Sequence, residues 1–417
     1  MGFTEKMLLV VIDGAGDRKI ASLGNKTPLE AAHMLHLQVI AKKSLAGMMY
    51  TIGKGIAPES DAAVLSLLGY NIKKEYTGRG PLEAYGAGIN VENDMLALRA
   101  NFAYVLSDGT VADRRAGRRV SAYEAKMLAK EINSLHISGA EFLFKPTVGY
   151  RGVVVIKSKQ KLSSSISNAD IGYIKKGNIS IALHKYSSRL PKVKALKNDE
   201  ASKRTARIVN ELVEKIRYKL GKSRINIERV KKGLPPANAL LLRDAGLGLP
   251  RVKNFKEKYG LSAAFITEMP VERGIAKLLK MREIKINETD NLARRYMEMA
   301  KHARSALKEN DFVYVHIKGP DEYGHNGDAE GKKESLELVD TFFKSLRKIN
   351  YTIAVTADHS TPCELKAHSS DPVPLIIYNQ KVRPDGMEFN ENIDAKGSLG
   401  IITGSELVKT IMKVARL

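Results

Sequence analysis

The strongest constraint on the fold is a set of short, almost wholly apolar runs, each followed within two residues by Gly, Asp or Asn. The clearest are MLLVVI (7–12), FVYVHI (312–317), YTIAVTA (351–357) and VPLIIY (373–378). Runs with apolar residues on both faces are typical of strands buried between two layers. Segments with a helical spacing of apolar residues, such as PLEAAHMLHLQVIAKKS (28–44), lie between them. We therefore expect an α/β fold, with a largely parallel sheet covered by helices on both faces.

The middle of the chain has a different pattern, with strands and helices of its own. Its elements are, in order, MLALRANFAYVLSDGTVAD, AYEAKMLAKEINSL, RGVVVIKSK and DEASKRTARIVNELVEKIRYKL. Gly86, Gly88 and the segment GLPPANALLLRDAGLGLP offer hinges, because Gly and Pro interrupt regular elements. We expect an inserted α+β domain at 90–245, and a core domain formed by 1–89 and 246–417 together.

The charge of the chain narrows the class of partner. Its 417 residues include 68 Lys and Arg against 46 Asp and Glu, a formal net charge of +22. Such an excess favours anionic partners, and a solvated lysine-rich surface is the alternative. The lysine pairs are scattered, aromatic residues make up only 6% and Trp is absent, so we expect no base-stacking surface for nucleic acid.

The single cysteine, Cys363, excludes a disulfide or a cysteine-based zinc site within one chain and is compatible with a reducing compartment. The apolar run 7–12 is too short for a signal peptide, and no run approaches the roughly 18 apolar residues of a membrane span. We therefore expect a cytoplasmic protein without a membrane partner.

Carboxylates and imidazoles follow the predicted strands at several places. They are Asp13, Asp321, His325, Asp358, His359 and His368. Each one alone has an ordinary explanation, such as a turn for the Asp-Gly pair, but the carboxyl ends of parallel strands share one edge of the sheet. Three carboxylates gathered there would repel one another by several kcal/mol if poorly solvated, so we expect divalent cations. Imidazole ligands favour Mn²⁺, Zn²⁺ or Co²⁺ over Mg²⁺ or Ca²⁺.

Ser60 is the candidate nucleophile. It lies at the predicted start of a helix in APESDAAVLSLLGY. A helix N-terminus presents free N–H groups to a phosphate. A serine at a helix start is by itself most often an N-cap. Beside metal ions, however, its hydroxyl can be deprotonated near neutral pH and attack phosphorus.

Longer segments resemble the cofactor-independent (2,3-bisphosphoglycerate-independent) phosphoglycerate mutases of the archaeal type, in the alkaline phosphatase superfamily. Segments that mark the superfamily are VVIDGAGDR, APESDAAVLSLLGY, HIKGPDEYGHNGD and VTADHSTPCELKAHSSDPVPLIIY. The segments YTGRGPLEAYGAGI and DRRAGRRV mark the mutase branch. They follow one another in the family order over nearly the whole chain. The resemblance implies an alkaline-phosphatase-like core with an inserted substrate-binding domain.

The resemblance also implies two divalent ions and a reaction. The ligand sets are Asp321, His325 and His368 for one ion, and Asp13, Asp358, His359 and the Ser60 oxygen for the other. Mn²⁺ is the ion expected first, with Co²⁺, Zn²⁺ and Mg²⁺ as alternatives. In glycolysis and gluconeogenesis, 2-phosphoglycerate and 3-phosphoglycerate would interconvert through a phosphoserine on Ser60, without 2,3-bisphosphoglycerate as a cofactor.

By the same resemblance, the inserted domain would hold the glycerate, since guanidinium groups pair bidentately with carboxylate and phosphate. The candidates are Arg114, Arg115, Arg118, Arg151, Arg243 and Arg273, with Asp113 as a proton shuttle and Lys318 to offset phosphoryl charge. Surface ion pairs are the alternative for each arginine. For the whole chain, the alternatives are a metal-dependent phosphatase or a phosphosugar mutase of the same superfamily, and a homo-oligomer stays open.

Overall fold

The chain forms two compact units. One consists of Met1–Glu75 with Val252–Leu417, and the other of Tyr76–Arg251. The sequence analysis places the domain boundaries at 89/90 and 245/246. That these segments are separate folding domains stays a prediction. The computed structural model describes residues 5–183, 187–287, 289–346, 349–393 and 396–417.

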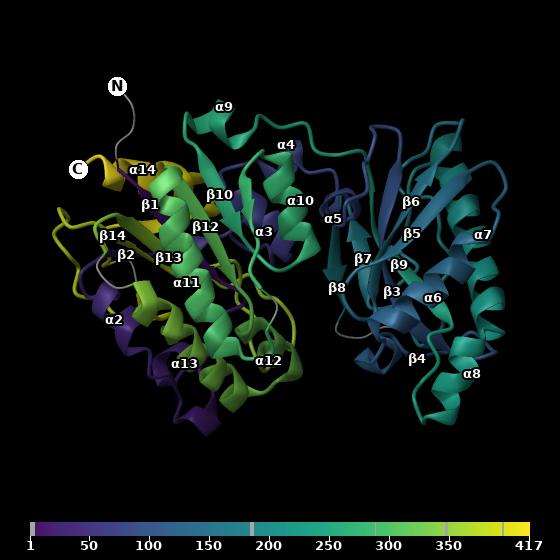
Figure 1. The fold of residues 1–417 in the computed structure, drawn as a ribbon, viewed down its shortest axis with the longest axis horizontal. Helices are drawn as coiled ribbons and strands as arrows, with labels where there is room; N and C mark the ends of the chain where they lie inside the picture. The colour runs from purple at the N-terminus through teal and green to yellow at the C-terminus, as the bar shows by residue number, and fades with distance from the viewer. Residues whose placement is uncertain (1–4, 184–186, 288, 347–348, 394–395) are drawn as a thin grey trace. The chain divides into compact units, whose positions relative to one another are not determined.

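A single sheet organises the first unit (Figure 1). Across the sheet, the strands are β11 (Arg282–Ile284), β10 (Ala263–Ile266), β12 (Phe312–Ile317), β1 (Met7–Ile12), β13 (Thr352–Ala357), β14 (Val373–Tyr378), β2 (Leu45–Tyr50) and β15 (Gly400–Thr403). Among these described strands, β14 alone runs against the others. The central strands β12, β1 and β13 pair in parallel, so their carboxyl ends meet at one edge.

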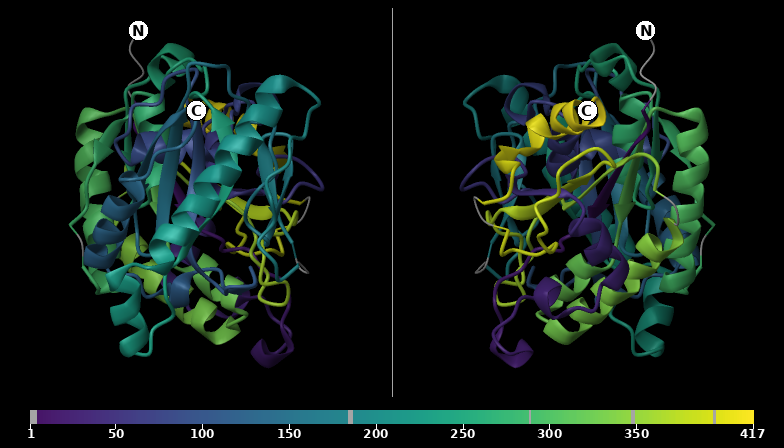
Figure 2. Two further views of the ribbon diagram at one scale, coloured as in Figure 1. Left: turned by 90° about the vertical axis from the view of Figure 1, so that its right-hand side faces the viewer. Right: turned by 90° about the vertical axis from the view of Figure 1, so that its left-hand side faces the viewer.

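Helices cover both faces of this sheet. Every residue of β1, β12 and β13 is buried, which requires a layer on each side. α11 (Leu292–Glu309) and α13 (Ala329–Leu346) pack together, and α11 packs on β1, β10 and β12. The C-terminal helix α14 (Leu407–Ala415) packs on β1 and β13 (Figure 2), while α3 (Ser60–Leu67) packs on α10 (Pro270–Leu278). The predicted α/β class with a largely parallel sheet is confirmed.

The remaining helices of the first unit are short. They are α4 (Ile72–Glu75), α9 (Phe255–Tyr259), α12 (Pro320–Asn326) and the 3₁₀ turns η1 (Ala21–Leu23) and η3 (Gly404–Glu406). None of the helices in the described part of the chain combines the length and the apolar character that a membrane crossing requires.

The expectation of a single helix over 28–44 is wrong. The segment forms two helices, α1 (Pro28–Ala31) and α2 (Leu35–Ala41). Asp340 of α13 accepts hydrogen bonds from the backbone N–H groups of His36 and Leu37, at 3.1 and 2.8 Å. This carboxylate satisfies the free N–H groups of a new helix start, which no spacing of apolar residues could reveal.

The second unit is an α+β structure built on an antiparallel sheet. Its strands are β4 (Val111–Asp113), β3 (Leu96–Val105), β6 (Arg151–Lys157), β5 (Glu141–Pro146) and β9 (Ala239–Leu247), with a separate hairpin of β7 (Tyr173–Lys176) and β8 (Ile179–Ala182). Its helices are α5 (Arg79–Gly86), α6 (Ala122–Asn133), α7 (Glu200–Gly221) and α8 (Arg224–Lys231), with the 3₁₀ turn η2 (Ala116–Arg118).

Alternate residues of β3 serve the two faces of this sheet. Leu96 and Leu98 join the main core, to which α6 and α7 contribute Leu128 and Leu212. Ala97, between them in sequence, packs instead in the smaller cluster that contains Ala84 of α5 and Val153 of β6. Because side chains alternate along a strand, a single strand thus supports both helical layers.

Lys332 of α13 joins two loops at the carboxyl edge of the first sheet. Its side chain is fully buried, and its Nζ donates to the carbonyls of Gly16 and Thr361, both at 2.9 Å. It also forms an ion pair with Asp17 at 2.8 Å. Because Gly16 follows β1 and Thr361 follows β13, one buried ammonium holds both loops in place.

We predict that Lys332→Met lowers the free energy of unfolding by about 3–5 kcal/mol, because it leaves the buried carboxylate of Asp17 without its partner. Urea denaturation measures the change. Lys333→Met, the neighbouring residue with an ion pair at the surface, is the control and should leave the midpoint unchanged. Equal effects of the two substitutions would contradict this role for Lys332.

Candidate active site

Three acidic residues lie where the central parallel strands end. Asp13 directly follows β1, Asp358 directly follows β13, and Asp321 lies in the first turn of α12, after β12. Gly14 brings these loops together. Its backbone N–H donates to Asp358 Oδ1 at 3.0 Å, and its φ of +61° favours glycine. A Cβ at this position would lie 2.7 Å from the Asp321 side chain, so the close approach also requires glycine.

A first cluster consists of Asp13, Asp358 and His359, all of them buried. His359 Nε2 lies 3.4 Å from Asp13 Oδ1 and 3.2 Å from Asp358 Oδ2. Both of these carboxylate oxygens are buried and accept no hydrogen bond from the described residues. Because an unpartnered buried carboxylate oxygen is costly, this donor set fits a divalent cation.

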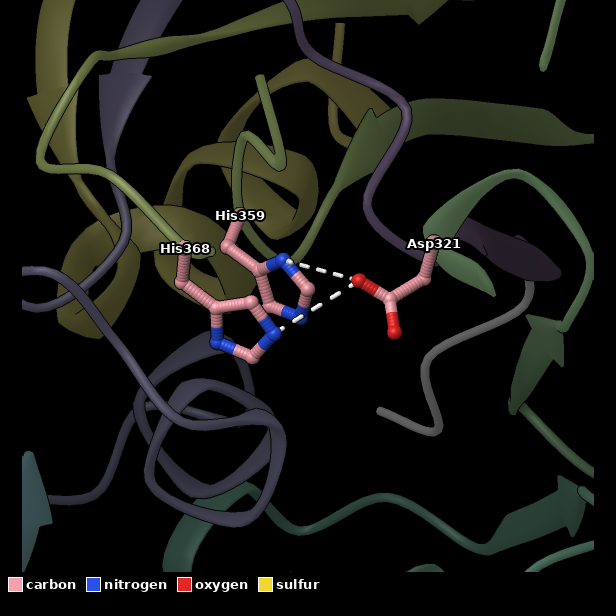
Figure 3. A group of neighbouring side chains, drawn as sticks. All are labelled: Asp321, His359 and His368. Atoms are coloured by element: carbon pink, nitrogen blue, oxygen red, sulfur yellow. Dashed lines mark ion pairs between the residues drawn. The ribbon is translucent and has the colours of Figure 1, made fainter. Parts of the chain in front are cut away.

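A second cluster consists of Asp321, His359 and His368 (Figure 3). Asp321 Oδ1 lies 3.5 Å from His368 Nε2 and 3.9 Å from His359 Nδ1. The expected ligand His325 lies there too, with its Nε2 3.6 Å from Asp321 Oδ2 and 3.2 Å from His368 Nε2. The carboxylate and imidazole donors of both predicted ligand sets therefore meet at this edge.

Thr361 determines which cluster His359 serves. The Thr361 hydroxyl donates to Asp321 Oδ1 at 2.7 Å, and the same oxygen lies 3.0 Å from His359 Nδ1. Because its one hydrogen goes to the carboxylate, the hydroxyl accepts from Nδ1–H of the imidazole. The lone pair of the neutral ring is then on Nε2, which faces Asp13 and Asp358. Thr361 was not among the predicted site residues, although it lies only two positions after His359.

The charged side chains at this edge of the sheet shift one another's pKa values. Burial acts to raise the pKa of Asp13, but the Lys318 ammonium at 2.8 Å and the nearby imidazoles lower it well below the ordinary value. The same Lys318 Nζ lies 2.9 Å from the buried Glu272, a residue that sequence reasoning missed. In this structure, the single ammonium of Lys318 thus pairs with two carboxylates.

Asp321 and His368 likewise shift each other's pKa. Burial and the charge of Asp13 act to raise the pKa of Asp321, yet hydrogen bonding with His368 and the charge of His325 bring it below its usual range. Burial acts to lower the pKa of His368, while Asp321 raises it to about 10. Both shifts reflect a carboxylate that is held among imidazoles.

Ser60 does not act as a helix cap. It is the first residue of α3, the N-cap position belongs to Glu59, and no side chain makes a capping hydrogen bond. The Ser60 hydroxyl is largely buried and lies 3.4 Å from His359 Nε2. It therefore borders the first cluster at a helix N-terminus, as a phosphoryl acceptor would require.

In the second unit, two of the predicted arginines share one acid. Asp170 Oδ1 lies 2.7 Å from Arg114 Nη2, and its Oδ2 lies 2.7 Å from Arg243 Nη1. Arg243 also forms an ion pair with Asp244 and stacks over the Tyr173 ring at 4.0 Å. Both arginines are thus held rigidly by buried partners.

Two buried arginines that sequence reasoning missed lie close by. Arg79 and Arg99 share the carboxylate of Glu83, at 3.2 and 3.4 Å. Burial and the charge of Arg79 lower the pKa of Arg99 to about 10, and Arg243 and Arg151 contribute to this effect. Such crowding of cations indicates an anion site. The only sequence signal was their position in segments of the mutase branch and in a buried strand.

The other predicted residues have different surroundings. Burial acts to raise the pKa of Tyr150, but the charges of Arg151, Arg115 and Arg118 help to bring it below the ordinary value, and the Arg151 guanidinium lies 5.1 Å from the centre of the Tyr150 ring. Asp113 ends β4 and accepts hydrogen bonds from the backbone of Arg115 and Gly117. Arg273 belongs to the first unit, on α10, and pairs with Glu283 at 3.2 Å.

Comparison with known proteins gives a consistent result. A family model described as 2,3-bisphosphoglycerate-independent phosphoglycerate mutase matches residues 41–226. Curated proteins with that name include one from Aeropyrum pernix, 42% identical with 96% of each chain covered. Another, from Methanocaldococcus jannaschii, is 41% identical and covers 98% of this chain and 96% of its own.

Solved structures agree. A protein from Pyrococcus horikoshii superposes with a TM-score of 0.80 at 30% identity, covering 100% of this chain and 98% of its own. The cofactor-independent phosphoglycerate mutase from Thermoplasma acidophilum gives a TM-score of 0.64 at 32% identity, covering 99% and 100%. The resemblance inferred from the sequence motifs is confirmed.

We predict that Thr361→Val weakens Mn²⁺ binding about 10- to 100-fold, because His359 and Asp321 lose the hydroxyl that orients them. Calorimetric titration of chelator-stripped protein measures the effect. Thr361→Ser keeps the hydroxyl and should bind Mn²⁺ like the unmodified chain. Unchanged affinity in the valine variant would show that this hydroxyl does not organise the donors.

Proposed function

The chain belongs to the family of 2,3-bisphosphoglycerate-independent phosphoglycerate mutases, and from this premise we propose that it interconverts 2-phosphoglycerate and 3-phosphoglycerate through a phosphoserine on Ser60. The observation that carries the proposal is the placement of the Ser60 hydroxyl. It lies 3.4 Å from His359 Nε2, and this nitrogen lies 3.4 and 3.2 Å from two carboxylate oxygens that have no hydrogen-bond partner among the described residues. A hydroxyl without a nearby cation site would not serve this chemistry.

Two divalent ions would complete the site. The ligands we propose are Asp13, Asp358, His359 and the Ser60 oxygen for one, and Asp321, His325 and His368 for the other. Bound there, such ions supply positive charge to phosphoryl oxygens and lower the pKa of a serine hydroxyl. Mn²⁺ suits the mixed imidazole and carboxylate donors and is the ion that we propose.

The chain's own residues perform the transfer in two steps. In the first, Ser60 Oγ, which has lost its proton beforehand, forms a bond to phosphorus, the bond between phosphorus and the glycerate oxygen breaks, and that oxygen takes up a proton from a protein acid. In the second, the other glycerate hydroxyl gives up its proton and attacks the phosphoserine, which frees Ser60. The N–H groups at the start of α3 stabilise the transferring phosphoryl group. Asp113 is our candidate to give the proton in the first step and to take one back in the second.

We propose that arginines of the second unit hold the glycerate. Five guanidinium groups gather there, those of Arg79, Arg99, Arg114, Arg151 and Arg243, and the ion pairs of the described residues join them to three acids, Glu83, Asp170 and Asp244. This excess of positive charge supports binding of a substrate with a carboxylate and a phosphate. Arg115 and Arg118, near Tyr150, extend the same positive surroundings.

The remaining roles follow from the reaction. An enzyme with this activity would act in glycolysis and gluconeogenesis, and we propose the cytoplasm as its compartment. Its partner would be a small phosphorylated substrate. Because Ser60 carries the phosphoryl group itself, no 2,3-bisphosphoglycerate is needed. Assembly into a homo-oligomer stays a prediction.

We predict that Ser60→Ala abolishes the interconversion and the phosphoenzyme trapped by acid quench with ³²P-labelled substrate, because no other atom then accepts the phosphoryl group. The exposed Ser134→Ala is the control and should keep both. Full mutase activity of Ser60→Ala would exclude the nucleophile. Rapid release of inorganic phosphate by the unmodified chain, without isomerisation, would favour a metal-dependent phosphatase instead.

We predict that Arg151→Met raises the KM for 3-phosphoglycerate roughly 10- to 100-fold, since a charge-assisted hydrogen bond contributes about 1.5–3 kcal/mol. Mn²⁺ affinity should not change, because Arg151 belongs to the other unit. Lys157→Met, at the exposed end of the same strand, is the matched control. A KM that is equal in the two variants would exclude Arg151 from substrate binding.

A further inference from the structure

His316 is a buried imidazole that neither predicted ligand set includes. It lies on β12, beside Val11 of β1, and has no exposed surface. Its Nδ1 lies 2.9 Å from the Tyr314 hydroxyl. Its Nε2 has no hydrogen-bond partner among the described residues and lies 3.8 Å from both Asp13 Oδ1 and Asp358 Oδ2.

The three facing atoms of His316, Asp13 and Asp358 do not satisfy one another. A separation of 3.8 Å is too long for a hydrogen bond. Within the part of the chain that the structure describes, each of these atoms is buried without a hydrogen-bond partner, and leaving such a group unsatisfied costs about 1–3 kcal/mol. Lys318 does not relieve this arrangement, because its Nζ contacts the other oxygen of Asp13, Oδ2.

Four of the six separations among these donor atoms are close to those of ligands around one ion. His359 Nε2 lies 3.4 and 3.2 Å from the two carboxylate oxygens, and His316 Nε2 lies 3.8 Å from each of them. Four tetrahedral ligands at about 2.0–2.2 Å from an ion are themselves roughly 3.3–3.6 Å apart. The measured separations bracket this range, so a modest inward movement of His316 would close the set.

We propose that His316 Nε2 is a further protein ligand of the ion bound by Asp13, Asp358 and His359. The inference rests on the proposed function only in assuming that this cluster binds a divalent ion. Tyr314 would orient the new ligand, because a ring that binds an ion through Nε2 carries its proton on Nδ1 and can donate it to the Tyr314 hydroxyl, 2.9 Å away. The Ser60 hydroxyl lies next to this donor set, 3.4 Å from His359 Nε2.

A competing role for His316 makes the opposite prediction. A protonated imidazole would balance the two carboxylates as a permanent cation, and it would then compete with a metal ion for them. Its removal would strengthen metal binding, or leave it unchanged, whereas removal of a ligand weakens binding. The direction of the change in affinity therefore separates the two roles.

The test is a calorimetric titration of chelator-stripped protein with Mn²⁺ in the absence of substrate. For His316→Gln, we expect one ion to bind as in the unmodified chain and the other about 10- to 100-fold more weakly. Tyr314→Phe keeps the ring that stacks on Phe265 and removes only the orienting hydroxyl, so it should weaken the same ion by a smaller factor. Thermal unfolding of the metal-free variants checks their folding.

Two outcomes would overturn the assignment: Mn²⁺ affinity unchanged or increased in His316→Gln, or, if that variant does not fold, unchanged affinity in Tyr314→Phe. His36→Gln, which changes a histidine on α2 outside these clusters, is the matched control. The proposed function fails separately, if the unmodified chain binds two ions but does not isomerise phosphoglycerate.

Discussion

The arrangement of the first unit depends on holding three carboxylates together at the edge of a parallel sheet. Asp13, Asp321 and Asp358 follow neighbouring strands, and their mutual repulsion in a poorly solvated site amounts to several kcal/mol. The surrounding cations and donors offset this cost. Lys318 takes one oxygen of Asp13, the Thr361 hydroxyl takes one of Asp321, and Gly14 N–H takes one of Asp358. At Asp13 and Asp358, the oxygen that accepts no hydrogen bond from the described residues is the one that faces His316 and His359.

The scaffold around these groups resists their separation. Lys332 joins the loops after β1 and β13 from within α13, and the Gly14 turn brings the first of these loops against Asp321. The strands behind the loops are buried on both faces. Fixed donors of this kind lose little freedom when an ion binds.

The parallel strands and several residues at their carboxyl ends could be predicted from the sequence, because short local patterns indicate them. Apolar runs that end in Asp or Asp-His indicated the parallel strands and the carboxyl edge, and Asp13, Asp358 and His359 lie together as expected. The rest depends on tertiary contacts. The break between α1 and α2 depends on Asp340, which is distant in sequence. Thr361 and His316 look like ordinary strand-end and strand residues until their neighbours are known. The ion pair of Lys318 with Glu272 likewise joins separate elements.

The central claim is that the buried carboxylates and imidazoles at this edge form two cation sites around one hydroxyl. The most direct measurement is anomalous X-ray diffraction at the manganese edge from crystals grown with Mn²⁺. The account predicts two anomalous peaks, one at about 2.0–2.3 Å from donors of Asp13, Asp358 and His359, and one at a similar distance from donors of Asp321 and His368. Occupied Mn²⁺ sites elsewhere, with no peak at this edge of the sheet, would contradict it.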